Sequence, residues 1–234
     1  APASPLSAMQ QVECVKAAFI EVTHKPMETA AEGSCAPVLA NASSLAMTRA
    51  NQTTQKGDGQ VIEVIDSGLQ TDHDAFSGSM YGVDVRMSQA DAQALAGTLP
   101  HGSAGTYVNS KIPFAYDYAD NDANVVPTST KDMSHGTHVA AIAAANGGEV
   151  RGTAPNAQII VAKVVHDADG VMSDSALLAA LDDALVIKPD VINISLGDDA
   201  GMSSDAGSIF AGVYEKLTDA GITVNAAAGN AFSN

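Results

Sequence analysis

The stretch Val61-Ile62-Glu63-Val64-Ile65-Asp66-Ser67-Gly68 decides the fold, because a β-branched apolar run ends there at an acidic turn. Such a run is typical of a buried strand that leads into a loop. Other apolar runs fit strands at 158–165, 191–195 and 222–227. Apolar residues that recur with the period of an α-helix predict helices at 135–145, 173–185 and 208–220. Residues 70–134 are polar and irregular, apart from a short predicted helix at 89–96.

Apolar strands that alternate with helices predict an α/β fold, with a parallel sheet that carries helices on both faces. In such sheets the functional site lies beyond the carboxyl ends of the strands. Asp66, Gly197 and the pair Gly229-Asn230 each follow a predicted strand, so we expect them to meet at one edge. Because the strands stop after 222–227, we expect the sheet to be incomplete in this chain.

Composition excludes some classes of partner. The chain has 234 residues, a net charge of −16 and 46% hydrophobic residues, which is enough for one large domain with a full core. An acidic surface repels phosphate backbones, so nucleic acid is not an expected partner. No apolar run approaches the roughly 18 residues that cross a bilayer, so membrane insertion is not expected.

Two residues carry side chains suited to acid–base chemistry. Asp66 ends a buried strand, where a carboxylate can orient an imidazole, although aspartate is also common in turns after strands. His135 opens a predicted helix, where it can take a proton from a nucleophile and return it to a leaving group. The alternative is a capping or metal-binding pair with His138, but no glutamate completes a zinc motif. We interpret His138 as a packed core histidine.

Four motifs occur in a fixed order: VIDSG at 64–68, HGTHVA at 135–140, INISLG at 192–197 and AAAGN at 226–230. Together they resemble the subtilisin-like serine peptidase family (subtilases), over roughly 56–234. The resemblance implies that Asp66 is the catalytic acid, His135 the general base and Asn230 the donor to the oxyanion. From the pattern alone, Asn230 also fits an asparagine in a turn after glycine.

The resemblance also implies where a protein or peptide substrate binds. Ser195, Leu196 and Gly197 would form the strand that pairs with the substrate backbone, and Gly170 is a candidate for the opposite strand. Ala227, Ala228 and Gly229 would wall the pocket for the residue before the scissile bond. Asp66 and His135 are 69 positions apart, which is longer than in compact subtilases. Between them, Phe114-Ala115-Tyr116-Asp117-Tyr118 and the acidic stretch that follows resemble the cell-envelope proteinase branch, which includes lactocepins and C5a-peptidase-like enzymes. That branch implies a secreted or cell-surface location.

The resemblance divides the chain into an N-terminal extension, 1–55, and the N-terminal part of a catalytic domain, 56–234. In the extension, 9–22 fits a short helix. Cys14 and Cys35 form either one disulfide or two free thiols. A disulfide that closes a loop of about 20 residues would stabilise the folded state by about 3 kcal/mol.

The nucleophile of the family stands in a Gly-Thr-Ser-Met-Ala type of segment after the oxyanion asparagine, and none follows Asn230 here. We therefore expect an endopeptidase whose serine lies on a second polypeptide or a missing segment, with this chain inactive by itself. The alternative is a catalytically dead scaffold that serves as a binding or adhesion module. A nucleotide-binding protein is disfavoured, because Gly57-Asp58-Gly59 precedes its strand and lacks a third glycine.

No metal and no cofactor is required by this interpretation. Many subtilases hold calcium in the loop after the histidine helix, and here that loop is shortened to 146–150, with Ala75 at the helper position. The stretch 120–124 resembles the start of a calcium loop. However, it has no glycine at the sixth position and has Lys131 at the twelfth, so we interpret it as a solvated acidic loop.

Overall fold

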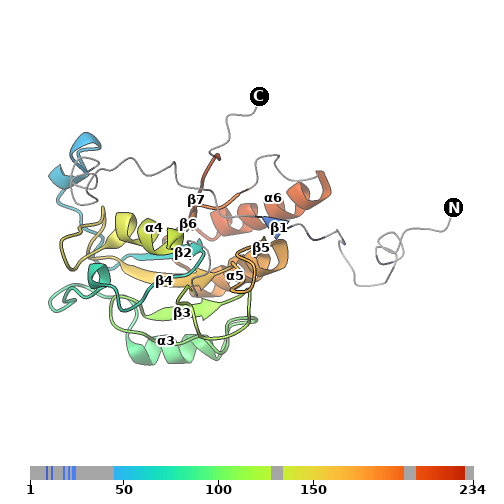
Figure 1. The fold of residues 1–234 in the computed structure, drawn as a ribbon, viewed down its shortest axis with the longest axis horizontal. Coiled ribbons are helices and arrows are strands. Elements are labelled where there is room, and N and C mark those ends of the chain that lie inside the picture. The colour runs from blue at the N-terminus through green and yellow to red at the C-terminus, as the bar shows by residue number, and fades with distance from the viewer. Residues whose placement is uncertain are drawn as a thin grey trace.

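The computed structural model describes residues 45–127, 134–197 and 204–229, and six isolated residues nearer the N-terminus. Its centre is a five-stranded parallel sheet with the strand order β3-β4-β2-β6-β7 (Figure 1). The predicted parallel α/β sheet is therefore confirmed. The strands are β2 (Val61–Asp66), β3 (Phe114–Asp117), β4 (Gln158–Lys163), β6 (Val191–Ile194) and β7 (Thr223–Ala226).

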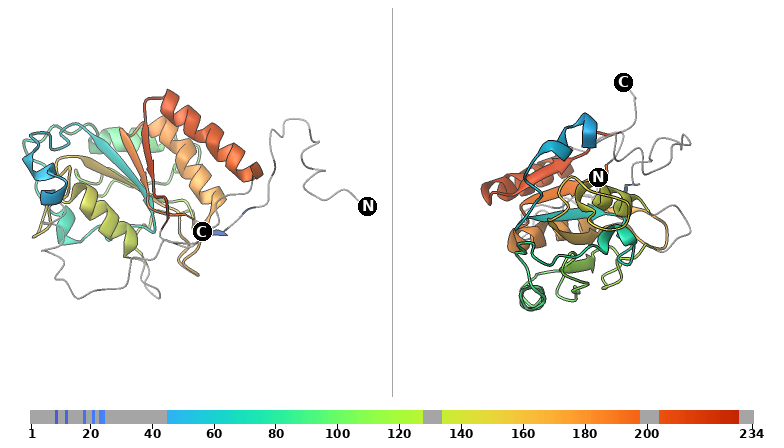
Figure 2. Two further views of the ribbon diagram at one scale, coloured as in Figure 1. Left: turned by 90° about the horizontal axis from the view of Figure 1, so that it is seen from above. Right: turned by 90° about the vertical axis from the view of Figure 1, so that its left-hand side faces the viewer.

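Helices cover both faces of this sheet, as the alternating pattern predicted. Helix α4 lies on one side, and α5 and α6 lie together on the other (Figure 2). Helix α3 runs along the β3 edge (Figure 1). The helices are α3 (Gln89–Ala96), α4 (His135–Ala144), α5 (Asp174–Ile187) and α6 (Ser204–Asp219), with short 3-10 turns at Ala50–Gln52 and Asp74–Phe76.

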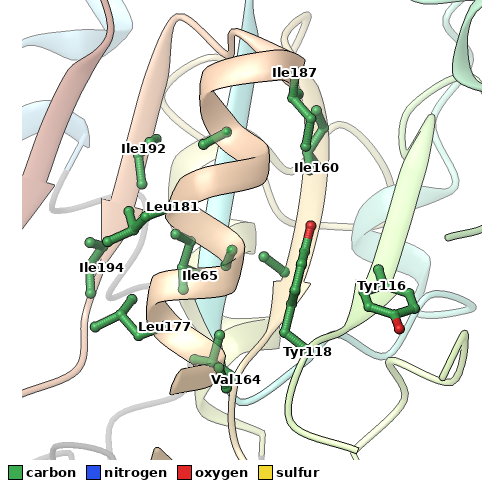
Figure 3. Close-up of a cluster of buried hydrophobic side chains, with 14 of the residues drawn as sticks. Ile65, Tyr116, Tyr118, Ile160, Val164, Leu177, Leu181, Ile187, Ile192 and Ile194 are labelled. Atoms are coloured by element: carbon green, nitrogen blue, oxygen red, sulfur yellow. The ribbon is translucent and has the colours of Figure 1, made fainter. Parts of the chain in front are cut away.

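Alternation along β2 explains why its sequence is apolar almost throughout. Val61 and Ile65 belong to the core cluster beneath α5 and α6, whereas Val64 belongs to the cluster beneath α4. Figure 3 shows α5 laying Leu177 and Leu181 over the sheet. Because both faces of a parallel sheet are covered, a central strand must be apolar on both sides, and a continuous apolar run results.

The prediction that residues 70–134 are irregular was wrong at β3. Phe114–Asp117 forms a four-residue strand in which every residue is buried. The sequence pattern missed it because the run is short, contains no β-branched residue and ends on an aspartate. Helix α3 agrees with the prediction, and its N-terminus is closed by a capping box between Ser88 and Asp91. Helix α6 begins at Ser204, four residues before the predicted start.

The predictions for the N-terminal extension are only partly covered by the described residues. Of the helix predicted at 9–22, Met9 is helical, but Val12, Ala18 and Glu21 are not. Thr23–His24 forms a short strand, β1, that pairs antiparallel with β5 (Met172–Ser173). Cys14 and Cys35 lie outside the described residues.

The β7 edge of the sheet is open. Among the described residues, β7 pairs with β6 alone. Thr223, Asn225 and Ala226 are exposed, and so are Ala227 and Ala228 just beyond the strand. An open edge of this kind offers unpaired backbone groups to a further strand. The expectation of a sheet that is incomplete in this chain stays a prediction, because an open sheet has an edge strand in any case.

A buried carboxyl group lies beneath the sheet on the α5 face. Glu63 of β2 is 0% exposed, and neither of its oxygens accepts a hydrogen bond from the described residues. Asp183 of α5 is also buried, and it accepts hydrogen bonds from Gly102 N, His101 N and Tyr118 Oη. Burial, together with the nearby charge of Asp183, raises the pKa of Glu63 to about 8. Glu63 therefore carries a proton at neutral pH.

We predict that Glu63→Gln stabilises the chain at alkaline pH. The folded state binds one more proton than the unfolded state between the ordinary glutamate pKa of 4.5 and about 8, so stability falls as pH rises through that window. Glutamine mimics the protonated carboxyl group and removes this slope. Chemical unfolding should show the variant about as stable as the wild type at pH 4 and roughly 5 kcal/mol more stable at pH 8.5.

The matched control is Glu215→Gln, at an exposed position of α6. It should leave the pH dependence of unfolding unchanged. Parallel pH profiles for Glu63→Gln and the wild type would show that Glu63 is ionised in the folded protein.

Candidate active site

The candidate site residues lie along the carboxyl edge of the sheet, as the strand pattern predicted. Asp66 is the last residue of β2, whose neighbours are β4 and β6. The loop after β4 carries Gly170, and the end of β6 leads into 195–197, so these two segments flank Asp66. Residues 227–229 follow β7, one strand further along.

Asp66 and His135 are in direct contact, although 69 positions separate them. His135 is the first residue of α4, and its Nδ1 lies 2.8 Å from Asp66 Oδ1. The Asp66 side chain is 1% exposed and the His135 side chain 13%. A carboxylate partner requires Nδ1 to carry the proton, which leaves Nε2 as the basic nitrogen. This arrangement can move a proton between a nucleophile and a leaving group.

The carboxylate of Asp66 is held by its own turn. Ser67 N donates to Asp66 Oδ1 at 2.7 Å, so this oxygen accepts from both Ser67 and His135. The second oxygen, Oδ2, is buried and accepts no hydrogen bond from the described residues. Two donors on one oxygen fix the carboxylate, and through it the imidazole ring.

Glycine at position 136 lets α4 approach the end of β2. A Cβ at Gly136 would lie 2.2 Å from Gly68 O and 3.0 Å from Asp66 Cβ, closer than real Cβ contacts allow. Gly136 N also donates to Ser67 Oγ at 3.0 Å, and Gln70 N donates to Thr137 Oγ1 at 2.9 Å. The helix is thus joined directly to the turn that carries Asp66.

The segment after β6 continues the edge in an extended form. Leu196 is buried, whereas Ser195 and Gly197 are half-buried. Asn193 Nδ2 donates to Ser195 Oγ at 3.0 Å, and Ala227 N donates to Ile194 O at 3.0 Å. The start of the segment after β7 is therefore tied to the end of β6.

The last predicted pocket residues are less enclosed. Ala227, Ala228 and Gly229 are exposed within the described chain. Asn230, the predicted oxyanion donor, lies outside the described residues.

Gly170 lies in a tight hairpin after β4. Gly170 N donates to His166 O, and His166 N donates to Val171 O, both at 2.9 Å. The hairpin leads directly into β5. A groove of about 1040 Å³ lies beside it, and neither Asp66 nor His135 lines it. The groove is lined by side chains of this hairpin, β1, β5 and α5, and by His101, Tyr118, Ala119, Asn121 and Val213.

His138 does not lie in the core, contrary to the interpretation of its motif. It is exposed, because the buried face of α4 consists of Gly136, Ala140 and Ala144 at a spacing of four residues. The acidic stretch 120–124 is exposed, but the Asp120 side chain also contacts Lys163 and His166, so the interpretation as a solvated loop does not hold for this residue.

Sequence reasoning missed Lys163, the last residue of β4. Its ammonium is 0% exposed and lies among the carboxylates of Asp117, Asp120 and Asp167. These three carboxylates come within 4.8 Å of one another, and in the described chain they form the one cluster spaced for a metal. The sequence signal was a lysine that ends an otherwise apolar strand, because a buried lysine needs acidic partners.

The fold and this site define a class: an α/β protein with an aspartate–histidine pair at the carboxyl edge of a parallel sheet. The model of the subtilase family matches residues 57–234, so the chain belongs to the subtilase family. The resemblance seen in the four motifs is therefore confirmed.

Known relatives agree with this membership. The chain is 37% identical over 175 residues to the PI-type proteinase of Lactococcus lactis subsp. cremoris, which covers 70% of this chain and 9% of that protein. A PII-type proteinase of Lacticaseibacillus paracasei is 35% identical over 175 residues, which again cover 70% of this chain and 9% of that protein. The chain thus spans about a tenth of the length of these relatives. The identity to these proteinases agrees with the predicted resemblance to the lactocepin branch.

More distant similarity extends to plants and to a solved structure. The subtilisin-like protease SBT4.6 of Arabidopsis thaliana is 30% identical, over 73% of this chain and 24% of its own length. The crystal structure of a cold adapted subtilisin-like serine proteinase is 23% identical, with a TM-score of 0.49, and covers 76% of this chain and 49% of that one.

No helix in the described part of the chain is both long enough and apolar enough to cross a membrane.

We predict that Gly136→Ala destabilises the domain. The added methyl group would force the first turn of α4 away from Gly68 O and Asp66, an overpacking that typically costs about 1 to 3 kcal/mol. Thermal unfolding should show a melting temperature lower by roughly 3 to 9 °C.

The matched control is Gly212→Ala in α6, where no described atom lies within 4 Å of the added Cβ. Because alanine favours a helix over glycine, this control should unfold at the wild-type temperature or slightly above it. An equally stable Gly136→Ala variant would contradict the close approach of α4 to β2.

Proposed function

We propose that this chain supplies the acid and the base of a serine endopeptidase. The observation that carries the proposal is the 2.8 Å contact between His135 Nδ1 and the buried carboxylate of Asp66. Membership of the subtilase family, whose triad contains an aspartate, a histidine and a serine, supports the same reaction.

In the proposed reaction, His135 Nε2 takes the proton of a serine hydroxyl as its oxygen attacks the scissile carbonyl carbon. Asp66 keeps the proton of His135 on Nδ1 and stabilises the imidazolium that forms. Asn230 donates its side-chain N–H to the oxyanion. His135 then gives its proton to the leaving amine, and water releases the acyl group by the same steps.

We propose that the serine comes from a second polypeptide or from a further segment of the protein, and that this chain alone is inactive. The open β7 edge supports this proposal, since a further strand pairing there would extend the sheet. The buried Oδ2 of Asp66 accepts no hydrogen bond from the described residues, so a donor from such a segment would satisfy it.

The proposed substrate is a protein or peptide that binds in an extended form beside Asp66. Gly170 and the segment Ser195-Leu196-Gly197 would pair with its backbone on either side, because their strands β4 and β6 flank β2. Ala227, Ala228 and Gly229 would wall the pocket before the scissile bond. We propose a secreted or cell-surface location, by analogy with the lactocepin branch.

A serine-directed fluorophosphonate tests the division of labour. Applied to the protein that contains this chain together with the serine segment, it should label the serine outside residues 1–234. His135→Ala should reduce labelling at least about a thousandfold, because the serine loses its base. The matched control, His138→Ala, removes an exposed imidazole from the same helix and should label normally.

Label on a residue of this chain would contradict the proposal. A purified partner that lacks a reactive serine, together with equal labelling of His135→Ala and the wild type, would instead favour a binding module on a dead scaffold.

We further propose that the loop after α4 functions without calcium. Two backbone carbonyl groups there already accept hydrogen bonds: Ala75 O, in the 3-10 turn beside the loop, from Asn146 N and Gly147 N, and Asn146 O from the Arg151 guanidinium. The buried Asn146 Oδ1 accepts none from the described residues. A guanidinium bonded to a carbonyl oxygen supplies the positive charge that a cation would bring.

Calcium titration followed by thermal unfolding should therefore leave the melting temperature of this chain unchanged within about 1 °C. Arg151→Gln should lower that temperature, and added calcium should not restore it. A melting temperature that rises by several degrees on addition of micromolar calcium would overturn the proposal.

A further inference from the structure

Three polar side chains stand side by side at the carboxyl ends of three neighbouring strands. Lys163 of β4 is in register with Asp66 of β2 on one side and with Asp117 of β3 on the other. The side chains two positions earlier on these strands pack in the core beneath α4. Because side chains alternate along a strand, all three project to the α4 face, where His135 also lies.

The hydrogen bonds of Lys163 run to the β3 side, away from Asp66. Its Nζ lies 2.5 Å from Asp117 Oδ2, 2.7 Å from Asp167 Oδ1 and 3.5 Å from Asp120 Oδ2. Burial alone would lower the pKa of Lys163, but the hydrogen bonds to Asp117 and Asp167 outweigh burial and raise it. The ammonium therefore stays charged and ties the loop after β4 to the end of β3.

The stem of the same lysine supports the turn that carries Asp66. A Cβ placed on Gly68 would lie 3.0 Å from Lys163 Cδ, so the stem passes directly beneath this turn. Gly68 O is also the atom against which Gly136 of α4 packs. Lys163 thus makes two contacts. Its aliphatic stem touches the turn after β2, against which α4 packs, and its ammonium binds the loop after β4.

The loop that Lys163 binds is the one that carries Gly170. Asp167 lies three residues before Gly170, and its backbone N–H donates to Asp120 Oδ2 at 2.9 Å. Asp120 Oδ1 lies 3.0 Å from His166 Nδ1, at the base of the hairpin. The loop is therefore held by charged groups at its start, where the Asp167 side chain is 29% exposed and Lys163 is fully buried.

We propose that Lys163 is a positioning residue: through Asp167 it holds the substrate-pairing loop around Gly170 at a fixed distance from Asp66. The ammonium touches no reacting atom, so it acts through the loop. The inference rests on the proposed function, because the role of Gly170 does. It predicts that loss of the tie weakens the binding of extended peptides and leaves the chemical step intact.

The first test variant is Asp167→Ala, in the protein that contains this chain and the serine segment. It cuts the tie to the loop and leaves the buried Lys163–Asp117 pair intact, so folding is preserved. The second is the double variant Lys163→Met with Asp117→Asn, which removes both buried charges together and avoids a lone one. The matched control is Asp219→Asn, at an exposed position of α6.

Two measurements are made on each variant. Steady-state kinetics compare an extended peptide with a single-residue ester that does not reach Gly170. Both test variants should raise KM for the peptide about tenfold, the equivalent of one charged hydrogen bond, with kcat and the ester kinetics within about twofold of wild type. Hydrogen exchange should be faster for the amides of 167–171 and unchanged in α5.

Equal losses on both substrates, or a peptide KM within about twofold of the control, would overturn the proposal. So would unchanged exchange at 167–171, whatever the kinetics. If the wild-type protein hydrolyses neither substrate, the proposed peptidase function fails. The exchange data still decide in that case whether Lys163 holds the loop, so the two failures are distinguishable.

Discussion

The site depends on one close approach between backbones, that of the first turn of α4 to the end of β2. At Gly136 the helix comes so near Gly68 O that a single methyl group would not fit. Only at that separation does His135, the first residue of the helix, reach the carboxylate of Asp66 at 2.8 Å. The glycine is thus a geometric requirement of the histidine beside it. The hydroxyl oxygens of Ser67 and Thr137, which accept hydrogen bonds from Gly136 N and Gln70 N, hold the same junction.

The second constraint is the free-energy cost of burying charged side chains at the ends of the strands. Asp66, Lys163 and Asp117 stand in register at strand ends that are covered by helix and loop, and each needs a partner because an unpaired buried charge is strongly unfavourable. The partners of the two aspartates differ in kind. Asp66 contacts a histidine, a residue type whose charge can change, whereas Asp117 contacts a lysine that stays charged. Glu63, on the opposite face of the sheet, avoids the cost of a buried charge because it stays protonated at neutral pH.

The proposed chemistry and the open edge of the sheet belong together. The edge at β7 is where the sheet ends among the described residues, and the segment expected to carry Asn230 leaves the sheet there. A further strand at this edge would extend the sheet.

The sequence by itself determined the parallel α/β sheet and most helix positions, because apolar period is a local property. It indicated Asp66 and His135 as partners through the family resemblance of their motifs. It did not show β3, whose four residues carry no strand pattern and are ordered by burial between α3 and β4. It placed His138 in the core, although the buried face of α4 is set by the sheet beneath it. Tertiary structure alone decided the partners of Lys163, because they lie 43 to 46 positions away or across a turn, and only strand register brings them together.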